Sequence, residues 1–498
     1  MYNNNEFRKK LEDFFNTDVE DEIKFFINTN KNDLVKKSQE NVLKGFHQYA
    51  PKIKGYMKFL KERSINIDNI RTINDFEKLP ITTKDNYILK YNFEDLVTDL
   101  AYVSSITSST GSTGNPIYWP RGTVKDIDLA KEYEFLFHLN YGIKNKKTLI
   151  IVSLGMGVWN SANITIAASI LIGYKGYEST LITPGLNMEE NIKIIKKFIH
   201  SEYDQIIFIA YPGFVKDIFR ECIINGIDIT KKDIFVLVGG ESITEEWRQY
   251  IYNQLDKEND GKRVVSLIGS SEGGIVAIET QYTNLLKMYL QKHPEKINDV
   301  FATKTMPTVT QYNPLVKYLE ESNNNVILTY FGVFPAIRYD TRDSGGIYFK
   351  EEIEKRLGRK FDVKDELNLP IVYIKGRSDV ALTIYSVNIY IDNIKHITYS
   401  LDLLKFITGR FQAYIEYDKE ENQIFYIKLE LNSGIDENTL DKNYILEYII
   451  SNLRKLNSEY NKLYASLGKK VSPIISYEEY VEGGLFSHDK PIYKKIKK

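Results

Sequence analysis

The chain has 498 residues, enough for about two to four folding units, and its composition (43% hydrophobic, 27% charged) is typical of a globular protein and not of a disordered one. Sixty-six Lys and Arg residues balance 67 Asp and Glu residues, which excludes a global field that would recruit nucleic acid or a membrane surface. The single cysteine, Cys222, excludes a disulfide framework within the chain and a zinc site of several cysteines. We expect Cys222 to be a small core residue on an apolar helix face.

The first residues, "MYNNNEFRKKLEDFF", lack the apolar core of a signal peptide. The most apolar helical run, Asn163–Tyr174, is well short of the roughly 20 residues that span a bilayer. Aromatic residues are frequent but are not interleaved with a basic patch, so nucleic acid is not an expected partner. We expect a cytoplasmic protein that binds no membrane.

Residues up to about Tyr91 are expected to be largely helical, because charged and apolar residues interleave. Leu79-Pro80 ends an element, and Thr82 or Thr83 can cap the next one.

From Lys147 onward, short apolar strands alternate with helices. The expected strands are Thr148–Ser153, Gln205–Tyr211, Asp233–Gly240 and Arg263–Gly269. Phe214–Ile224 reads as a helix, and Ser242 with Glu245 forms a capping-box pattern that starts another. Alternation of this kind predicts parallel crossovers in an α/β core, in which ligands bind beyond the carboxyl ends of the strands.

Beyond Pro370 the pattern changes to that of a small α+β domain. It predicts strands around a turn, a hairpin that turns at Glu420–Asn422, and a helix near Asn443–Leu463. The expected architecture is a large, multi-layered α/β N-terminal domain (1–375) followed by a small α+β C-terminal domain (376–498).

The loop "SSTGSTGNP" (Ser108–Pro116) lies between two strand-like segments. Glycines and hydroxyls in such a loop can turn backbone N–H groups inward to hold an anion. Only two residues separate Gly111 from Gly114, and a proline follows, which excludes a Walker phosphate loop. From these residues alone, an anion-binding loop and an ordinary polar turn are both open.

Five motifs in order resemble those of the adenylate-forming superfamily of acyl-CoA synthetases, adenylation domains and luciferases. They are "STGSTGNP", "GGES" (Gly239–Ser242), "IGSSEGG" (Ile268–Gly274), "AIRYDTRDSG" (Ala336–Gly345) and "GRSDVALTIYSVNIY" (Gly376–Tyr390). Two further segments, "LPITTKDN" and "SLGMGVWNSA", resemble the phenylacetate–coenzyme A ligase branch. The resemblance extends from about Leu79 to the C-terminus.

The resemblance implies a role for each motif. Glu272 would hold Mg²⁺, and Asp343 would accept hydrogen bonds from the ribose of ATP. Residues around the β- and γ-phosphates would be Ser109, Thr110, Gly111, Ser112, Thr113 and Gly114. The adenine slot and its surroundings would be Gly239, Gly240, Glu241, Ile268, Gly269, Ser270 and Ser271. Without the resemblance, Glu272 reads as a surface residue and Asp343 as a turn residue.

Arg377 and Asp379 resemble the hinge about which the family's small C-terminal domain moves between two half-reactions. The catalytic lysine of the family corresponds to Lys490, with Lys494 as the reserve, although Asp489 replaces the usual preceding glycine. As residues of a basic tail, both lysines are otherwise expected to be solvated.

The implied function is ATP- and Mg²⁺-dependent activation of an aryl or apolar carboxylic acid, followed by transfer to a thiol such as coenzyme A. The acid pocket is expected near Gly155–Asn160, Tyr211–Phe214 and Gly239–Glu241. Ile268 replaces the family's aromatic residue, and the hinge loop departs at Val380, Thr383 and Ser386. Four alternatives therefore stay open: transfer to an acyl-carrier protein, transfer to an amine, no second step at all, and a degenerate homologue that binds nucleotide or a partner without catalysis. The acid, the acceptor and the pathway are not specified, and homodimers are common among relatives.

Overall fold

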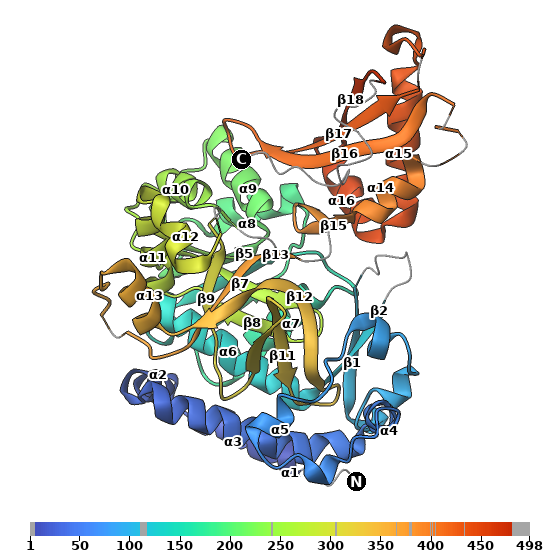
Figure 1. Ribbon diagram of the computed structural model, residues 1–498. Helices are drawn as coiled ribbons and strands as arrows, with labels where there is room; N and C mark the ends of the chain where they lie inside the picture. Colours follow the sequence, from blue (N-terminus) through green and yellow to red (C-terminus); the bar gives the residue numbers. More distant parts are fainter. Residues whose placement is uncertain are drawn as a thin grey trace. The chain divides into compact units, whose positions relative to one another are not determined.

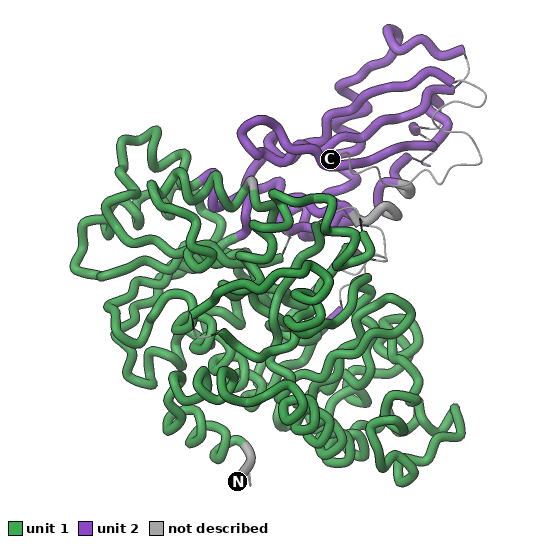
Figure 2. The backbone as a smooth tube through the Cα atoms, turned by 60° about the vertical axis from the view of Figure 1, so that its left-hand side comes forward, with its two compact units in different colours: residues 1–108, 118–210, 218–378 green, residues 109–117, 211–217, 379–498 purple. Residues whose placement is uncertain are grey.

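The computed structural model (Figure 1) describes residues 5–109, 117–240, 243–303, 306–364, 366–377, 381–398, 400, 402–403, 405–432 and 434–480. Figure 2 shows two compact units. The first comprises residues 1–108, 118–210 and 218–378, and the second comprises residues 109–117, 211–217 and 379–498. The assignment of ATP binding to residues 1–375 and of a lid to residues 376–498 stays a prediction.

The chain begins with helices, as expected: α1 (Asn5–Asn16), α2 (Val19–Asn28), α3 (Lys31–Tyr49), α4 (Lys54–Lys61) and α5 (Ile73–Phe76). Asp18 and Asn30 cap α2 and α3 through their side-chain oxygens. Thr83 caps the short turn of π-helix Lys84–Ile88. Thr82 instead exchanges backbone hydrogen bonds with Arg338 and Asp340 (2.9 Å each), which ties this segment to the main sheet.

An eleven-stranded sheet forms the centre of the first unit, in the order β10-β11-β12-β13-β9-β8-β7-β6-β5-β3-β4. Its strands are β3 (Thr148–Ser153), β4 (Ser179–Ile182), β5 (Gln205–Ala210), β6 (Asp233–Gly239), β7 (Val264–Ser270), β8 (Gly274–Ile278), β9 (Thr308–Gln311), β10 (Tyr318–Ser322), β11 (Asn325–Tyr330), β12 (Ala336–Tyr348) and β13 (Ile371–Arg377). The β4-β3-β5-β6-β7 portion is parallel, which confirms the predicted crossovers, and the remaining pairs are antiparallel. A separate two-stranded ladder joins β1 (Val103–Ser109) and β2 (Ile117–Gly122), the two flanks of the predicted phosphate loop.

The described residues of the central region also form eight α-helices. They are α6 (Thr123–Tyr141), α7 (Asn160–Tyr174), α8 (Met188–Phe198), α9 (Pro212–Ile224), α10 (Glu245–Gln254), α11 (Gln281–Lys292), α12 (Glu295–Phe301) and α13 (Lys350–Leu357). α6 and α7 pack on each other and on β8, while α10 and α11 pack on β7 and β9. Cys222 of α9 is fully buried, as expected, and burial raises the pKa of its thiol to about 12.

The predicted capping box of α10 is wrong. The cap is Thr244, whose Oγ1 accepts a hydrogen bond from the N–H of Trp247 (3.1 Å). Glu245 turns away from the helix start because its carboxylate pairs with buried Arg248 (2.9 Å).

The second unit is a small α+β structure, as expected. It contains β14 (Ala381–Ile384), β15 (Val387–Tyr390), α14 (Ile391–Thr398), β16 (Ile407–Tyr417), β17 (Gln423–Leu431), α15 (Lys442–Leu456), α16 (Ser458–Leu467) and β18 (Ile474–Glu478). The hairpin β16–β17 turns where predicted. The single helix expected near 443–463 is wrong, because Asn457 adopts an extended backbone and its side chain caps α16. None of the helices in the described residues is long and apolar enough to cross a membrane.

Candidate active site

The parallel strands β6 and β7 end side by side, so the residues that follow them share one edge of the sheet. Gly239 of β6 lies opposite Leu267 of β7, which places the predicted adenine segment next to Ile268–Ser270. Gly240 has a φ of 88°, in the region that favours glycine. A Cβ at Gly239 would lie 3.1 Å from Cδ1 of Leu267. Two of the segments predicted to bind nucleotide are therefore neighbours.

Glu272, the predicted Mg²⁺ ligand, lies in the turn between β7 and β8. The hydroxyl of Tyr339 in β12 donates a hydrogen bond to Oε1 of Glu272 (3.1 Å). The backbone carbonyl of Glu272 accepts hydrogen bonds from Nζ of Lys125 in α6 (2.5 Å) and from the hydroxyl of Tyr330 in β11. Three elements distant in sequence thus orient both the carboxylate and the backbone of Glu272.

Lys125 is a half-buried residue beside this turn. Its Nζ lies 3.7 Å from the centroid of the Tyr330 ring, within the range of a cation–π interaction. Burial, together with the positive charges of Arg121 and Lys317, lowers the pKa of Lys125 well below its usual range. Burial and the charge of Glu272 raise the pKa of Tyr330.

Asn160, the first residue of α7, connects the same turn to the start of the predicted phosphate loop. Its Nδ2 donates to the carbonyls of Ser270 (3.2 Å) and Ser271 (3.4 Å). Its Oδ1 accepts from Oγ1 of Thr107 (3.3 Å) and from Nη1 of Arg121 (3.2 Å). These hydrogen bonds fix the end of β1 relative to the turn that carries Glu272.

Asp343 and Arg377, predicted for ribose and hinge, lie opposite each other in the antiparallel pair β12–β13. The N–H of Asp343 donates to Oγ1 of Thr341 (3.2 Å), and Arg342 before it has a φ of 60°. This left-handed backbone is uncommon for residues with a side chain and gives β12 an irregular shape at the motif. The strand pairing therefore brings two predicted site residues together at the level of the backbone.

Several predicted site residues lie outside the described residues: Thr110, Gly111, Ser112, Thr113, Gly114, Glu241, Asp379, Lys490 and the reserve Lys494. For Ser109 and Arg377, the structure describes the backbone, as the last residues of β1 and β13. Their roles stay predictions.

The surroundings of Glu272 fit Mg²⁺ bound together with phosphates. In the described part of the chain, no group of three or more His, Cys, Asp or Glu side chains could hold a metal ion by itself. Mg²⁺ is typically bound by one or two carboxylates together with substrate phosphates, so a single oriented carboxylate is a suitable ligand. The six histidines of the sequence show no paired metal-ligand spacing.

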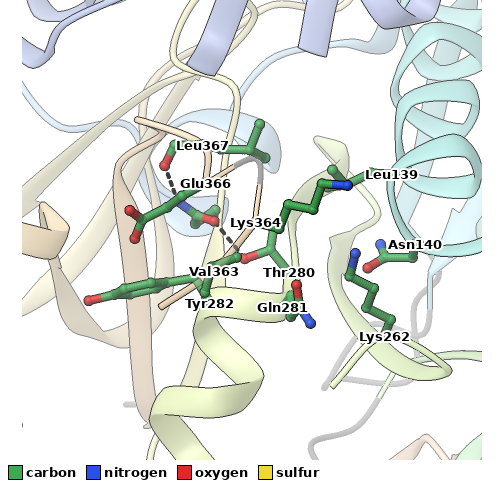
Figure 3. Close-up of a pocket in the computed structure, with 11 residues that line it drawn as sticks. Leu139, Asn140, Lys262, Thr280, Gln281, Tyr282, Val363, Lys364, Glu366 and Leu367 are labelled. Atoms are coloured by element: carbon green, nitrogen blue, oxygen red, sulfur yellow. Dashed lines mark hydrogen bonds between the residues drawn. The ribbon is translucent and has the colours of Figure 1, made fainter. Parts of the chain in front are cut away.

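A cavity of the first unit, drawn in Figure 3, is separate from the predicted site. Eleven residues line it, and none of them belongs to the predicted set. Thr280 and Gln311 close one side through a side-chain hydrogen bond (2.6 Å), and Lys262 and Lys364 extend into the space near Asn140. It is therefore not the predicted acid pocket.

Three residues of the site were absent from the prediction: Lys125, Tyr330 and Tyr339. Asn160 was expected only at the border of the acid pocket, and not as a link between β1 and the Glu272 turn. Asn160 and Tyr339 lie inside segments that resemble motifs of the family. These motifs were therefore the sequence signal that could have identified the two residues. Lys125 and Tyr330 lie in no motif, and only the folded sheet brings them to Glu272.

Comparison with known proteins gives similarity at the level of structure. No family model matches the chain, and no curated protein matches it either. Three solved structures of 2-hydroxyisobutyryl-CoA ligase are similar, each at 11% sequence identity and each covering 93% of this chain. The complex with 2-HIB-AMP and CoA in the thioesterification state has a TM-score of 0.62 and is covered over 89% of its own chain. The structure in the postadenylation state with 2-HIB-AMP has a TM-score of 0.53 and is covered over 88% of its own chain. The structure of an open conformation with 2-HIB-AMP and CoA has a TM-score of 0.52 and is covered over 90% of its own chain.

Similarity at this level of identity establishes the fold. It extends over both units, and it agrees with the order of motifs along the sequence. The phenylacetate ligase branch stays a prediction. This chain has the fold seen in 2-hydroxyisobutyryl-CoA ligase.

Proposed function

We propose that this protein is an ATP- and Mg²⁺-dependent ligase that converts a carboxylic acid into an acyl-adenylate, releases pyrophosphate, and transfers the acyl group to a thiol such as coenzyme A. One observation carries the proposal: hydrogen bonds through Asn160 and Tyr339 join β1, the turn with Glu272 and strand β12. These are the segments in which the sequence places phosphate, metal and ribose binding. The similar ligase forms complexes with 2-HIB-AMP and CoA, which supports the same reaction class.

In the first step, a carboxylate oxygen of the acid attacks the α-phosphorus of ATP. The bond from this phosphorus to the bridging oxygen breaks, and pyrophosphate leaves with the electron pair. The site must align the two reacting groups and stabilise charge on the phosphate oxygens. Residues Ser109–Gly114 would supply hydroxyls and backbone N–H groups to the β- and γ-phosphates.

Glu272, held by Tyr339, would bind Mg²⁺, which neutralises charge on the phosphates when bound. Asp343 would accept hydrogen bonds from the ribose hydroxyls. The backbone at Gly239–Gly240 and the side chain of Ile268 would contact the adenine. Lys490 would contact the carboxylate and the α-phosphate.

In the second step, the sulfur of a thiolate attacks the acyl carbon, the bond to the phosphate oxygen breaks, and AMP leaves. Arg377 and Asp379 would act as the hinge between the two steps. The departures at Val380, Thr383 and Ser386 concern the segment that faces the thiol in the family, so the acceptor is the open part of the proposal. A cytoplasmic location and a homodimer stay predictions.

The test is pyrophosphate release from ATP and Mg²⁺ with a panel of aryl, branched and straight-chain acids. We expect release that depends on the acid. Coenzyme A, a pantetheinylated carrier protein and hydroxylamine, added separately with the best acid, then identify the acceptor. Transfer to the carrier or the amine alone would replace the thiol ligase by one of these alternatives. ATP binding without pyrophosphate release from any acid would favour the degenerate nucleotide-binding homologue. Absence both of release with every acid and of ATP binding would refute the proposed enzyme.

A further inference from the structure

The carbonyl of Glu272 is held by two side chains that no nucleotide motif contains. Lys125 lies in the first turn of α6, and Tyr330 is the last residue of β11. Both donate to the same oxygen atom, and the lysine also lies over the tyrosine ring. The three groups therefore form one cluster, which we call the Glu272 clamp (Lys125, Tyr330 and the carbonyl of Glu272).

Lys125 stands in an environment that opposes a positive charge. The N-terminus of a helix carries positive partial charge, and Gly122 gives α6 no side-chain cap. Arg121 and Lys317 add like charge, while Glu132 and Glu272 are the acidic groups that face it. In the described part of the chain, no carboxylate lies within ion-pair distance of Nζ. The carbonyl of Glu272 and the ring of Tyr330 are therefore the groups that hold Nζ of Lys125.

Two donors on one carbonyl fix the plane of the peptide that follows Glu272. The hydrogen bond from Tyr339 fixes the carboxylate of the same residue. Residues of α6 and β11 thus hold the backbone of Glu272, and a residue of β12 holds its side chain. In the described residues, no hydrogen bond reaches Oε2 of Glu272, so this oxygen is open to a ligand.

We propose that Lys125 and Tyr330 are positioning residues that set the backbone of Glu272 for the Mg²⁺ complex of ATP. This inference rests on the proposed function and adds two residues to it. The clamp holds the backbone from which the carboxylate of Glu272 extends. Its loss should therefore raise the Mg²⁺ concentration that nucleotide binding requires and leave the affinity measured without Mg²⁺ unchanged.

The experiment measures binding of α,β-methylene-ATP, which cannot release pyrophosphate, by isothermal titration calorimetry over a series of Mg²⁺ concentrations. Tyr330→Phe keeps the ring and removes one hydroxyl, so the Mg²⁺ concentration for half-maximal tightening should rise about 2- to 10-fold. Lys125→Met should raise it roughly tenfold or more, because hydrogen bonds from charged groups are stronger. Lys125→Arg, which restores a charged donor, should recover part of the loss.

Tyr282→Phe is the matched control, because the hydroxyl of buried Tyr282 has no hydrogen-bond partner among the described residues. It should leave the Mg²⁺ requirement unchanged. Thermal melting identifies any variant that fails to fold, and Tyr330→Phe then carries the test. Suppose that Mg²⁺ tightens nucleotide binding in the wild type, and that folded Tyr330→Phe and Lys125→Met show the same dependence on Mg²⁺ concentration. The clamp then has no positioning role, and the proposed function stands. If the wild-type affinity does not respond to Mg²⁺ at all, the proposed function fails and the inference with it.

Discussion

Arg248 is fully buried between two carboxylates, and its replacement by methionine is a direct test of how the edge of the sheet is held in place. Its Nε pairs with Glu245 and its Nη2 with Glu279, both at 2.9 Å. Lys287 pairs with the same two carboxylates. Burial by itself would raise the pKa of Glu245. The positive charges of Arg248 and Lys287 outweigh this effect and hold the pKa below its usual range. The network connects the start of α10, which follows Gly239–Gly240, to α11.

Arg248→Met leaves two buried carboxylates with one ammonium group. Breaking a buried ion pair from one side typically costs about 3–5 kcal/mol, because the remaining charge has no compensation. The variant also loses the hydrogen bond that Arg248 donates to the carbonyl of Val264 in β7. We therefore expect the free energy of unfolding of the first unit to fall by about 3–5 kcal/mol. Adding Glu245→Gln restores the balance of charge and should recover part of this loss.

The assay is urea unfolding followed by tryptophan fluorescence. All three tryptophans, Trp119, Trp159 and Trp247, belong to the first unit, so the signal reports its unfolding. Lys193→Met removes an exposed ion pair with Glu189 and serves as the control, with no measurable change in stability expected because water screens the pair. A loss below about 1 kcal/mol for Arg248→Met would show that the buried network does not stabilise the first unit.

Three further predictions concern Glu22 of α2 and two residues of the candidate site. Burial raises the pKa of Glu22 to about 7, so the wild type loses stability as the pH rises from about 4.5 to 7. Glu22→Gln should raise the melting temperature at pH 8 and leave it nearly unchanged at pH 4.5, and equal shifts at both would contradict this. Asn160→Ala removes the hydrogen bonds between β1 and the Glu272 turn, so calorimetry should show about tenfold weaker binding of α,β-methylene-ATP; unchanged binding would count against the link. Asp343→Ala should abolish the preference for ATP over 2′-deoxy-ATP in pyrophosphate release, and a retained preference would remove Asp343 from the ribose site.

Most of the parallel core was predictable from sequence. Runs such as Thr148–Ser153 and Gln205–Ala210 are buried along their whole length, and such strands appear in the sequence as short, continuous apolar segments. Their order with the intervening helices then specifies the crossovers. By contrast, strand β4 has only partly buried and exposed residues, and no apolar run marks it.

Local rules failed where a tertiary contact decided the outcome. Ser242 and Glu245 have the spacing of a capping box, but Glu245 belongs to the buried network with Arg248 and Lys287. Helical periodicity continues from α15 into α16, but the extended backbone of Asn457 breaks the helix, and its side chain contacts Asn388 of β15 (2.8 Å). The cap of α10 and the break between α15 and α16 thus both involve contacts with residues far away in sequence, Lys287 and Asn388.

The site was predictable only to the extent that it lies in motifs. Glu272 and Asp343 were identified by resemblance, and the structure places them in the β7–β8 turn and in β12. Lys125 and Tyr330 are separated from Glu272 by 147 and 58 positions. A lysine early in a helix and a tyrosine at the end of a strand carry no local signal for a carbonyl in a distant turn.

The central claim is that the site forms an acyl-adenylate reversibly, and isotope exchange between pyrophosphate and ATP measures this step alone. We predict exchange that requires both Mg²⁺ and a carboxylic acid from the panel. Glu272→Gln should reduce it by about 100-fold or more, the scale of losing one transition-state contact in an active site. Glu258→Gln, at an exposed carboxylate after α10, should leave it unchanged. Exchange that is independent of any acid, or a folded Glu272→Gln variant with wild-type exchange, would contradict the account.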